Sequence, residues 1–136
     1  MPSKIKSIVF IVTTLFIGAM IYLLFRPPLS WLPSIKGWDK AIIDISWLPL
    51  PISDFILYHF SDVLWALSFA ETVYVIKNNL YIAVLISLVS TAVFETLQYF
   101  GVARGTGDIW DFIFVAISLS IYFVIKKGVN KNEKSA

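Results

Sequence analysis

The sequence predicts an all-α membrane protein whose four transmembrane helices form a bundle. The chain has 136 residues, of which 58% are hydrophobic, and its mean hydropathy is +0.80. A soluble domain of this length has too little interior to hide so much apolar surface from water. Four stretches approach the roughly 20 mostly apolar residues that cross a bilayer. They are residues 7–25, 54–76, 80–100 and 109–125.

The charges of the chain exclude several classes of protein. The net charge is only +2, and the lysines gather near the two ends of the sequence. A nucleic-acid-binding protein would instead carry a basic face or stripe, so we expect no nucleic-acid partner. The chain has no cysteine, which excludes disulfides and thiolate metal sites. The partner that the composition predicts is the lipid bilayer.

The ends of the first and last helices carry clear signals. The first apolar stretch ends at Arg26 and the pair Pro27-Pro28, and proline stops a helix. Its apolar core is longer than that of a signal peptide, and no small-residue cleavage site follows, so we expect an uncleaved helix. The last helix is predicted to end at Lys126-Lys127, with a polar, frayed tail at 128–136. Residues 1–136 are predicted to be a single domain.

The basic residues predict the orientation. Four crossings place both termini on one side, together with Lys4, Lys6, Lys77, Lys126, Lys127, Lys131 and Lys134. The other side holds Arg26, Lys36, Lys40 and Arg104. The lysine-rich side is expected to be cytoplasmic. The outer loop, 26–53, contains Trp31, Trp38, Trp47 and five prolines. It is either a plain linker or a short amphipathic segment near 36–46 that lies on the outer surface.

Polar residues are concentrated in the outer half of the predicted helices. With a rise of 1.5 Å per residue, they lie roughly 3–12 Å beneath the outer surface. These residues are His59, Asp62, Glu95, Gln98 and Asp111. The inner half is predicted to be nearly free of polar side chains. Its main internal charge is Glu71, which we expect to have a structural role, either reaching the interface or meeting a lysine.

Helical spacing predicts that the polar residues share one pocket. Side chains three or four residues apart lie on one face of a helix. Four such faces are Thr14/Gly18/Tyr22, Asp54/Tyr58/Asp62, Ser87/Thr91/Glu95/Gln98 and Asp108/Asp111/Ser118/Tyr122. Turned inward, they would form a polar pocket that opens to the outside. The predicted ligand-binding residues are His59, Asp62, Glu95, Gln98, Arg104, Asp108, Asp111 and Arg26.

Several chemistries are open at such a site. Its carboxylates outnumber its arginines, so at least one is protonated or meets a cationic group. The turn "ARGTGD" is either a phosphate cradle or a plain turn in which Asp108 caps the next helix. His59, Asp62, Glu95 and Asp111 are suitable metal ligands, but one histidine with scattered carboxylates is a weak signal, and we predict neither metal nor cofactor. Ser61 is adjacent to His59 and cannot face it, which argues against a catalytic triad.

The stretch "FETLQYFGVARGTGDIWDF", residues 94–112, resembles the VanZ-like family of small bacterial membrane proteins. The matching residues are Glu95, Gln98, Arg104, Asp108 and Asp111, together with His59-Phe60 on the preceding helix. The resemblance covers residues 54–125, although Val115 and Ser118 stand where the family commonly has Asn and Gly. It implies a multi-pass protein of the bacterial cytoplasmic membrane with an outward polar site. The family is named for a glycopeptide (teicoplanin) resistance determinant, and the resemblance supplies no reaction.

The function expected first is binding at the cell envelope. The outer pocket would bind a lipid headgroup, a cell-wall precursor or a glycopeptide antibiotic, with a possible role in antibiotic resistance. Whether the protein is an enzyme stays open: His59, Asp62 and Glu95 could supply acid–base chemistry on a lipid-linked substrate. A small ion- or proton-coupled transporter is a further alternative, disfavoured by the apolar inner half. A purely structural subunit is the last.

Overall fold

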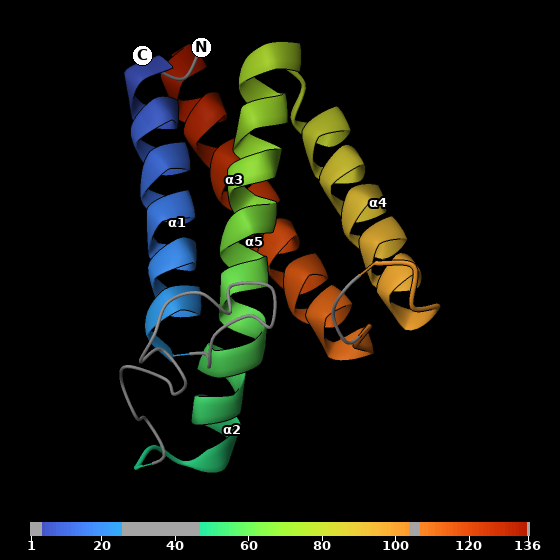
Figure 1. Cartoon of the computed structure of the whole chain (residues 1–136). Helices are drawn as coiled ribbons and strands as arrows, with labels where there is room; N and C mark the ends of the chain where they lie inside the picture. Colours follow the sequence, from blue (N-terminus) through green and yellow to red (C-terminus); the bar gives the residue numbers. More distant parts are fainter. Residues whose placement is uncertain (1–3, 26–46, 104–106, 136) are drawn as a thin grey trace.

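The computed structural model describes residues 4–25, 47–103 and 107–135, and within these ranges it contains helices and no strand. The all-α prediction is therefore confirmed. In chain order the elements are α1 (Lys4–Phe25), α2 (Leu50–Asp54), the π-helix η1 (Phe55–His59), α3 (Phe60–Lys77), α4 (Leu80–Tyr99) and α5 (Ile109–Ser135) (Figure 1). The segment predicted near 36–46 lies outside the described residues.

Three of the helices are long and apolar enough to cross a membrane, namely α1, α4 and α5 as far as Lys131. Their positions agree closely with the predicted spans 7–25, 80–100 and 109–125. The prediction of a frayed tail at 128–136 is wrong for most of this segment, because α5 continues through it to Ser135. α3 does not belong to this group, since its 18 residues include Asp62, Glu71 and Lys77.

A π-turn separates α2 from α3 and changes which side chains share a face. α2, η1 and α3 follow one another without a break, and the N–H of Phe60 donates to the carbonyl of Phe55 across the π-turn. A π-turn holds more residues than an α-turn, so it rotates everything that follows. Tyr58 is 55% exposed and Asp54 is exposed, whereas Asp62 is half-buried. The predicted stripe Asp54/Tyr58/Asp62 is therefore wrong.

α3 is the central helix of the molecule. It contacts α1, α4 and α5, and α4 also contacts α5. α1 and α4 lie on opposite sides of α3 (Figure 1), and no Cα atoms of these two helices come within 8 Å in the described residues. α1 begins and α5 ends at the same end of the molecule. The charged helix is thus the one that its neighbours cover best.

Two short connections are determined by residues suited to turns. Asn78 ends α3 in the left-handed conformation, with φ of 50°, and the Asn79 side chain caps α4 by accepting from the N–H of Ile82. Asparagine tolerates both roles. Gly101 has φ of 69° and ends the last turn of α4, donating to the carbonyl of Gln98. These turns determine where α4 begins and ends.

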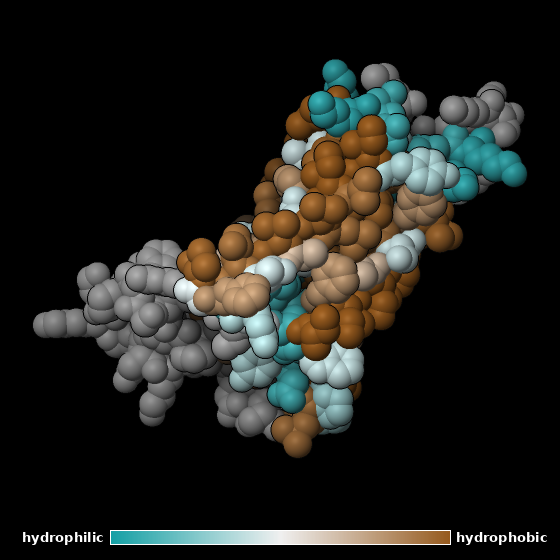
Figure 2. Space-filling model, turned by 90° about the vertical axis from the view of Figure 1, so that its right-hand side faces the viewer, coloured by the Kyte–Doolittle hydropathy of each residue, from teal (hydrophilic) through white to brown (hydrophobic). Residues whose placement is uncertain are grey.

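The described surface matches a bilayer environment. Large apolar side chains on α1, α4 and α5 are exposed, among them Phe16, Val93 and Ile121 at 64%, 53% and 55%. In Figure 2 hydrophobic residues cover the middle of the visible face, hydrophilic residues gather at one end, and a smaller hydrophilic group lies toward the other. Exposing this apolar band to water would be unfavourable, whereas contact with lipid tails carries no such free-energy cost. The arrangement indicates a multi-pass membrane protein.

Small side chains let α1 approach α3 closely. The buried residues of α1 are Ser7, Thr14, Gly18 and Ile21, on one face of the helix. A Cβ atom added to Gly18 would lie 2.7 Å from Cδ1 and Nε1 of Trp65. Close approach through small residues is the usual way in which membrane helices pack. Of the predicted contact face Thr14/Gly18/Tyr22, the first two residues are buried as expected, while Tyr22 is only half-buried.

Replacing Gly18 should loosen the contact between α1 and α3. We expect Gly18→Val to destabilise the folded protein by about 1–3 kcal/mol, because the added methyl groups force Trp65 to move. Thermal or detergent-induced unfolding of the purified protein measures the effect. The matched control is Gly128→Ala on α5, where an added Cβ meets no atom within 4 Å. It should be neutral or slightly stabilising, and equal effects of the two substitutions would contradict this packing.

Candidate functional site

A histidine–aspartate pair joins the π-turn to α5. Nδ1 of His59 lies 2.5 Å from Oδ1 of Asp111, and both side chains are only 13% exposed. His59 closes η1, and π-segments inside α-helices occur frequently at functional sites. The imidazole packs between aromatic rings, with the centroids of Phe114 and Phe55 at 5.0 and 6.4 Å. The pair is held by residues 52 positions apart in the chain, so it depends on the fold.

Glu95 and Asp108 organise the start of α5. The backbone N–H of Asp108 donates to Oε2 of Glu95 at 3.1 Å, and Oδ1 of Asp108 accepts from the N–H of Trp110 at 3.0 Å. Asp108 therefore caps α5, which is one of the two alternatives that the sequence leaves open for this turn. The positive end of a helix dipole stabilises nearby carboxylates. Both acids are thus placed where the beginning of α5 offers them N–H groups.

Close packing against α4 explains why one residue of the glycine-rich turn, Gly107, is a glycine. A Cβ atom there would lie 2.4 Å from the backbone nitrogen of Tyr99 and 2.7 Å from the carbonyl oxygen of Glu95. Only glycine allows the chain to pass this close to the end of α4. The capped turn accounts for Gly107 and Asp108 without a phosphate. Arg104 and Gly105 lie outside the described residues, and so does Arg26.

Glu95 interacts both with the His59–Asp111 pair and with Asp108 at the start of α5. The side chains of Asp111, Asp108 and His59 interact electrostatically with its carboxylate. Asp62 and Glu95 together line a cavity of about 470 Å³ between α3 and α4, and Glu95 and Asp108 line a second one of about 370 Å³ beside Gly107. Glu95 is thus common to both cavities. The predicted site residues in the described ranges do not all line one pocket, contrary to the prediction. Gln98 is half-buried on the last turn of α4.

The described part of this end is acidic. It holds Asp54, Asp62, Glu95, Asp108 and Asp111 together with His59, and it contains no lysine or arginine within the described ranges. Such a set of groups favours a cation or a ligand with a cationic part. No three His, Asp or Glu side chains in the described ranges are arranged to hold a metal ion. The acidic end is suited to binding by charge and hydrogen bonds.

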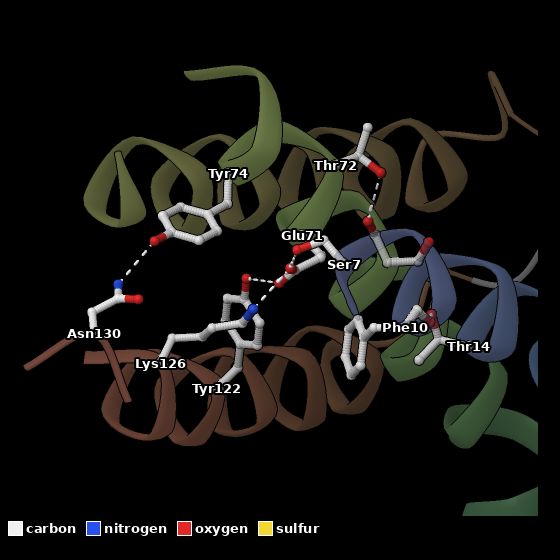
Figure 3. Close-up of polar contacts among 10 residues, drawn as sticks. Ser7, Phe10, Thr14, Glu71, Thr72, Tyr74, Tyr122, Lys126 and Asn130 are labelled. Atoms are coloured by element: carbon white, nitrogen blue, oxygen red, sulfur yellow. Dashed lines mark hydrogen bonds and ion pairs between the residues drawn. The ribbon is translucent and has the colours of Figure 1, made fainter. Parts of the chain in front are cut away.

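A second polar cluster lies at the opposite end, around Glu71 (Figure 3). The Glu71 side chain is fully buried, and it accepts hydrogen bonds from Ser7 Oγ and Tyr122 Oη at 2.5 Å each. Lys126 Nζ donates to the same carboxylate at 2.8 Å and keeps 21% of its side chain exposed. The cluster therefore ties α1, α3 and α5 together through one carboxylate.

This cluster corrects one prediction and supports another. The inner half was expected to be nearly free of polar side chains, and this is wrong, because Ser7 and Tyr122 donate to Glu71 there. Glu71 does meet a lysine, which is one of its two predicted outcomes. Sequence reasoning missed Ser7 as a partner and placed Tyr122 in the outward pocket. The spacing of Tyr122 and Lys126, four residues apart on one helix face, is the signal that could have identified the cluster.

Comparison of the chain with protein-family models, with curated proteins and with solved structures finds no match. The geometry of the two polar ends is therefore the basis for a proposal on function.

Substitutions that remove the charges of Glu71 and Lys126 should have strongly non-additive effects on the free energy of unfolding. Lys126→Met leaves a buried carboxylate without its cation, and removing one partner of a buried pair costs about 3–5 kcal/mol. Adding Glu71→Gln to this variant should restore much of the loss, because an amide still meets Ser7 and Tyr122 without a charge. Unfolding of the two single variants and the double variant gives the coupling energy.

The neighbouring Lys127 serves as the control for this cycle. It is exposed, and its ammonium group lies 5.7 Å from the ring of Phe123. Lys127→Met should change stability by no more than about 0.5 kcal/mol. If Lys126→Met and Lys127→Met were equally mild, or the two changes at Glu71 and Lys126 were additive, the buried pair would not contribute as described.

Proposed function

We propose that this chain is a four-span protein of the bacterial cytoplasmic membrane, of the VanZ-like type, whose outward site binds a polar headgroup. In this proposal α2, η1 and α3 together form the fourth span. Their 28 residues, 50–77, would extend over roughly 42 Å at 1.5 Å per residue. The charges within α3 are compatible with a span because α1, α4 and α5 pack around it. The resemblance to the VanZ-like family adds the link to the cell envelope.

The distribution of lysines supports the orientation. Those in the described helices lie at the start of α1, at the end of α3 and in the last part of α5. α1 begins and α5 ends at one end of the molecule (Figure 1), which is where these lysines gather. A lysine-rich end is the cytoplasmic one in most membrane proteins. The His59–Asp111 pair would then belong to the outer end.

The observation that carries the proposed function is the contact between His59 and Asp111. A histidine and a carboxylate inside a membrane protein are costly and commonly functional. Both interact electrostatically with Glu95, which together with Asp108 lines a cavity of about 370 Å³ with a largely apolar lining. A headgroup could meet the polar groups while its lipid part lies against Tyr99 and Phe112 of the same cavity. Membrane lipids and lipid-linked cell-wall precursors share this combination, as do glycopeptides that carry an acyl chain.

The same pair supports a second candidate, an enzyme acting at the outer leaflet. Asp111 holds Nδ1 of His59, which orients the imidazole and directs Nε2 toward acid–base chemistry. The substrate would again be lipid-linked. Turnover of such a substrate that disappears in Glu95→Gln, with headgroup binding retained, would favour the enzyme over a binding protein.

The proposed topology makes a labelling prediction. The chain has no native cysteine, so single cysteines report on sidedness directly. Lys77→Cys lies at the exposed end of α3, and Val102→Cys lies beyond α4, where Val102 is 74% exposed. In cells whose cytoplasmic membrane is intact and whose outer layers let the reagent through, a membrane-impermeant maleimide should label Val102→Cys. Lys77→Cys should react only after the membrane is permeabilised. Labelling of both positions from one side would rule out a crossing by α4.

Headgroup binding should stabilise the protein and depend on the outer pair. We expect at least one member of a panel of envelope lipids, lipid-linked precursors and glycopeptides to raise the unfolding temperature. A ligand at 100 times its Kd stabilises by about 2.7 kcal/mol. His59→Phe, which keeps the ring beside Phe114, and Asp111→Asn should abolish the shift. The measurement is thermal unfolding in neutral lipid nanodiscs.

Glu71→Gln is the matched control for this experiment. It removes a buried carboxylate at the other end of the molecule, so it should lower the unfolding temperature of the free protein and leave the ligand-induced shift intact. Flat melting curves across the whole panel would contradict the proposed function. So would a shift that persists in both His59→Phe and Asp111→Asn.

A further inference from the structure

The lysine-rich end of the molecule carries positive charge that no described acid offsets. In Figure 1, α1 begins and α3 and α5 end at this end. The lysines of the described side chains gather there, namely Lys4, Lys6, Lys77, Lys126, Lys127 and Lys131. Glu71, the one acidic side chain described at this end, is fully buried and already pairs with Lys126. Lys4, Lys77 and Lys127 are exposed and form no ion pair with a described residue, so their charge is available to an anionic partner.

α5 holds its lysines in place because it stays helical past the apolar stretch and remains joined to α3. Asn130 donates to Tyr74 Oη at 2.8 Å, which ties the last part of α5 to α3. Nζ of Lys126 lies 5.4 Å from the centroid of the Tyr74 ring, on the α3 side. Nζ of Lys127 instead lies 5.7 Å from the ring of Phe123. Of the two neighbouring lysines, one therefore closes the joint between helices and the other stays at the surface.

An aromatic pair joins α4 to α5 beside Lys127. The rings of Tyr81 and Phe123 meet edge to face, with their centroids 4.9 Å apart, and Tyr81 is still 65% exposed. Lys77 ends α3, and a short turn leads from it into the first turn of α4, where Tyr81 lies. Tyrosine and lysine side chains have apolar bodies and polar ends, which suits them to the headgroup layer of a membrane. This place thus combines ring surface with positive charge from two helices.

An exposed apolar stripe leads away from the aromatic pair along α4. Tyr81, Leu85 and Val89 are spaced by four residues and therefore share one face of the helix. Leu85 and Val89 are 61% and 53% exposed. The stripe from Tyr81 to Val89 covers roughly 12 Å at 1.5 Å per residue. Positive charge at the helix end with an apolar track beneath it matches the shape and charge of a phospholipid whose headgroup is negative.

We propose that the lysine-rich end binds an anionic phospholipid at the place defined by Lys77, Lys127 and Tyr81. The phosphate would pair with the two ammonium groups, and an acyl chain would lie along Leu85 and Val89. A zwitterionic lipid carries its own cation beside the phosphate, so the lysines favour a headgroup with net negative charge. This lipid site goes beyond the outer site proposed above and does not depend on which headgroup that site takes.

Two lipids with the same acyl chains test the role of headgroup charge. Dioleoyl phosphatidylglycerol or dioleoyl phosphatidylcholine is titrated into the full chain in an uncharged detergent, and thermal unfolding is followed. We expect phosphatidylglycerol to raise the unfolding temperature saturably by about 4 °C or more, and phosphatidylcholine to raise it much less. Glycerol 1-phosphate, which has the phosphate but no chains, should have no effect. Equal shifts with the two lipids, or a full shift with glycerol 1-phosphate, would overturn the proposal.

Substitutions of lysine locate the headgroup. Lys127→Gln and Lys77→Gln should each raise the phosphatidylglycerol concentration at half-maximal shift by about fivefold. Lys127→Arg keeps the charge and should behave like the unchanged protein. Because both lysines are exposed, neither glutamine variant should alter the unfolding temperature in detergent alone. Asp54→Asn, which removes an exposed charge at the acidic end, should leave the lipid response unchanged.

A pair of apolar substitutions locates the acyl chain. Leu85→Ser on α4 should weaken the response to phosphatidylglycerol by about threefold or more, because it removes apolar contact area. Val12→Ser is the matched control, since Val12 is 59% exposed on α1, which lies on the opposite side of α3 (Figure 1). Equal effects of the two substitutions would contradict the placement of the chain along α4.

The variants also separate this site from the outer one. An anionic member of the headgroup panel could act at either end of the molecule, so its shift is measured in both sets of variants. A shift that is lost in Lys77→Gln/Lys127→Gln and kept in His59→Phe supports the lipid site. A phosphatidylglycerol shift that persists unchanged in Lys77→Gln/Lys127→Gln overturns it. A response to another headgroup that depends on His59 would still stand in that case.

Discussion

The structure depends on one constraint: charges inside an apolar medium must have partners. α3 carries Asp62 and Glu71, and His59 directly precedes it. A lone charge near the middle of a bilayer costs about 2.5–3.5 kcal/mol on insertion scales. Glu71 avoids this cost because Ser7, Tyr122 and Lys126 reach it from two other helices. The central position of α3 follows, since only a helix surrounded by others can find partners for charges on several faces.

The same constraint divides the molecule into two ends with different roles. At the lysine-rich end the carboxylate of Glu71 is neutralised by Lys126 and fully enclosed, which suits a fixed joint between helices. At the other end Glu95 is half-buried, its neighbours Asp108 and Asp111 are also acidic, and it lines two cavities. A group with satisfied charge and no access contributes stability, whereas acidic groups beside open space are available to a ligand. The chemistry of the protein is therefore expected at the acidic end.

The sequence predicted the helices better than the faces they present. Hydropathy places α1, α4 and the start of α5 within a few residues, because lipid-facing helices must be apolar along their whole length. It ends α5 too early, since the helix continues through the polar segment to Ser135. Periodicity also anticipated Gly18 as a contact residue, and Asp108 as a cap was one of the two alternatives for its turn. It failed between Asp54 and Asp62, since a π-turn shifts the phase and leaves no recognisable sequence signal. The contact of Glu71 with a lysine was one of two predicted outcomes, but its partners Ser7 and Tyr122, which are 64 and 51 residues away in the chain, were missed. Such pairings depend on helix crossing, which periodicity does not specify.

The arrangement of helices around α3 has a consequence for ligands. In a closed four-helix bundle each helix contacts two neighbours and the interior opens only toward water. Here α1 and α4 share α3 as their neighbour but have no Cα atoms within 8 Å of each other in the described residues. The cavity with Asp62 and Glu95 lies between α3 and α4 and includes Leu15 of α1 and Val115 of α5, while the His59–Asp111 pair joins the end of η1 to the start of α5. Glu95 lines this cavity and also the one beside Gly107, so a charge bound in either cavity would act on the same carboxylate. A molecule with a polar head and an apolar body is the kind of ligand that this geometry can hold along its whole length.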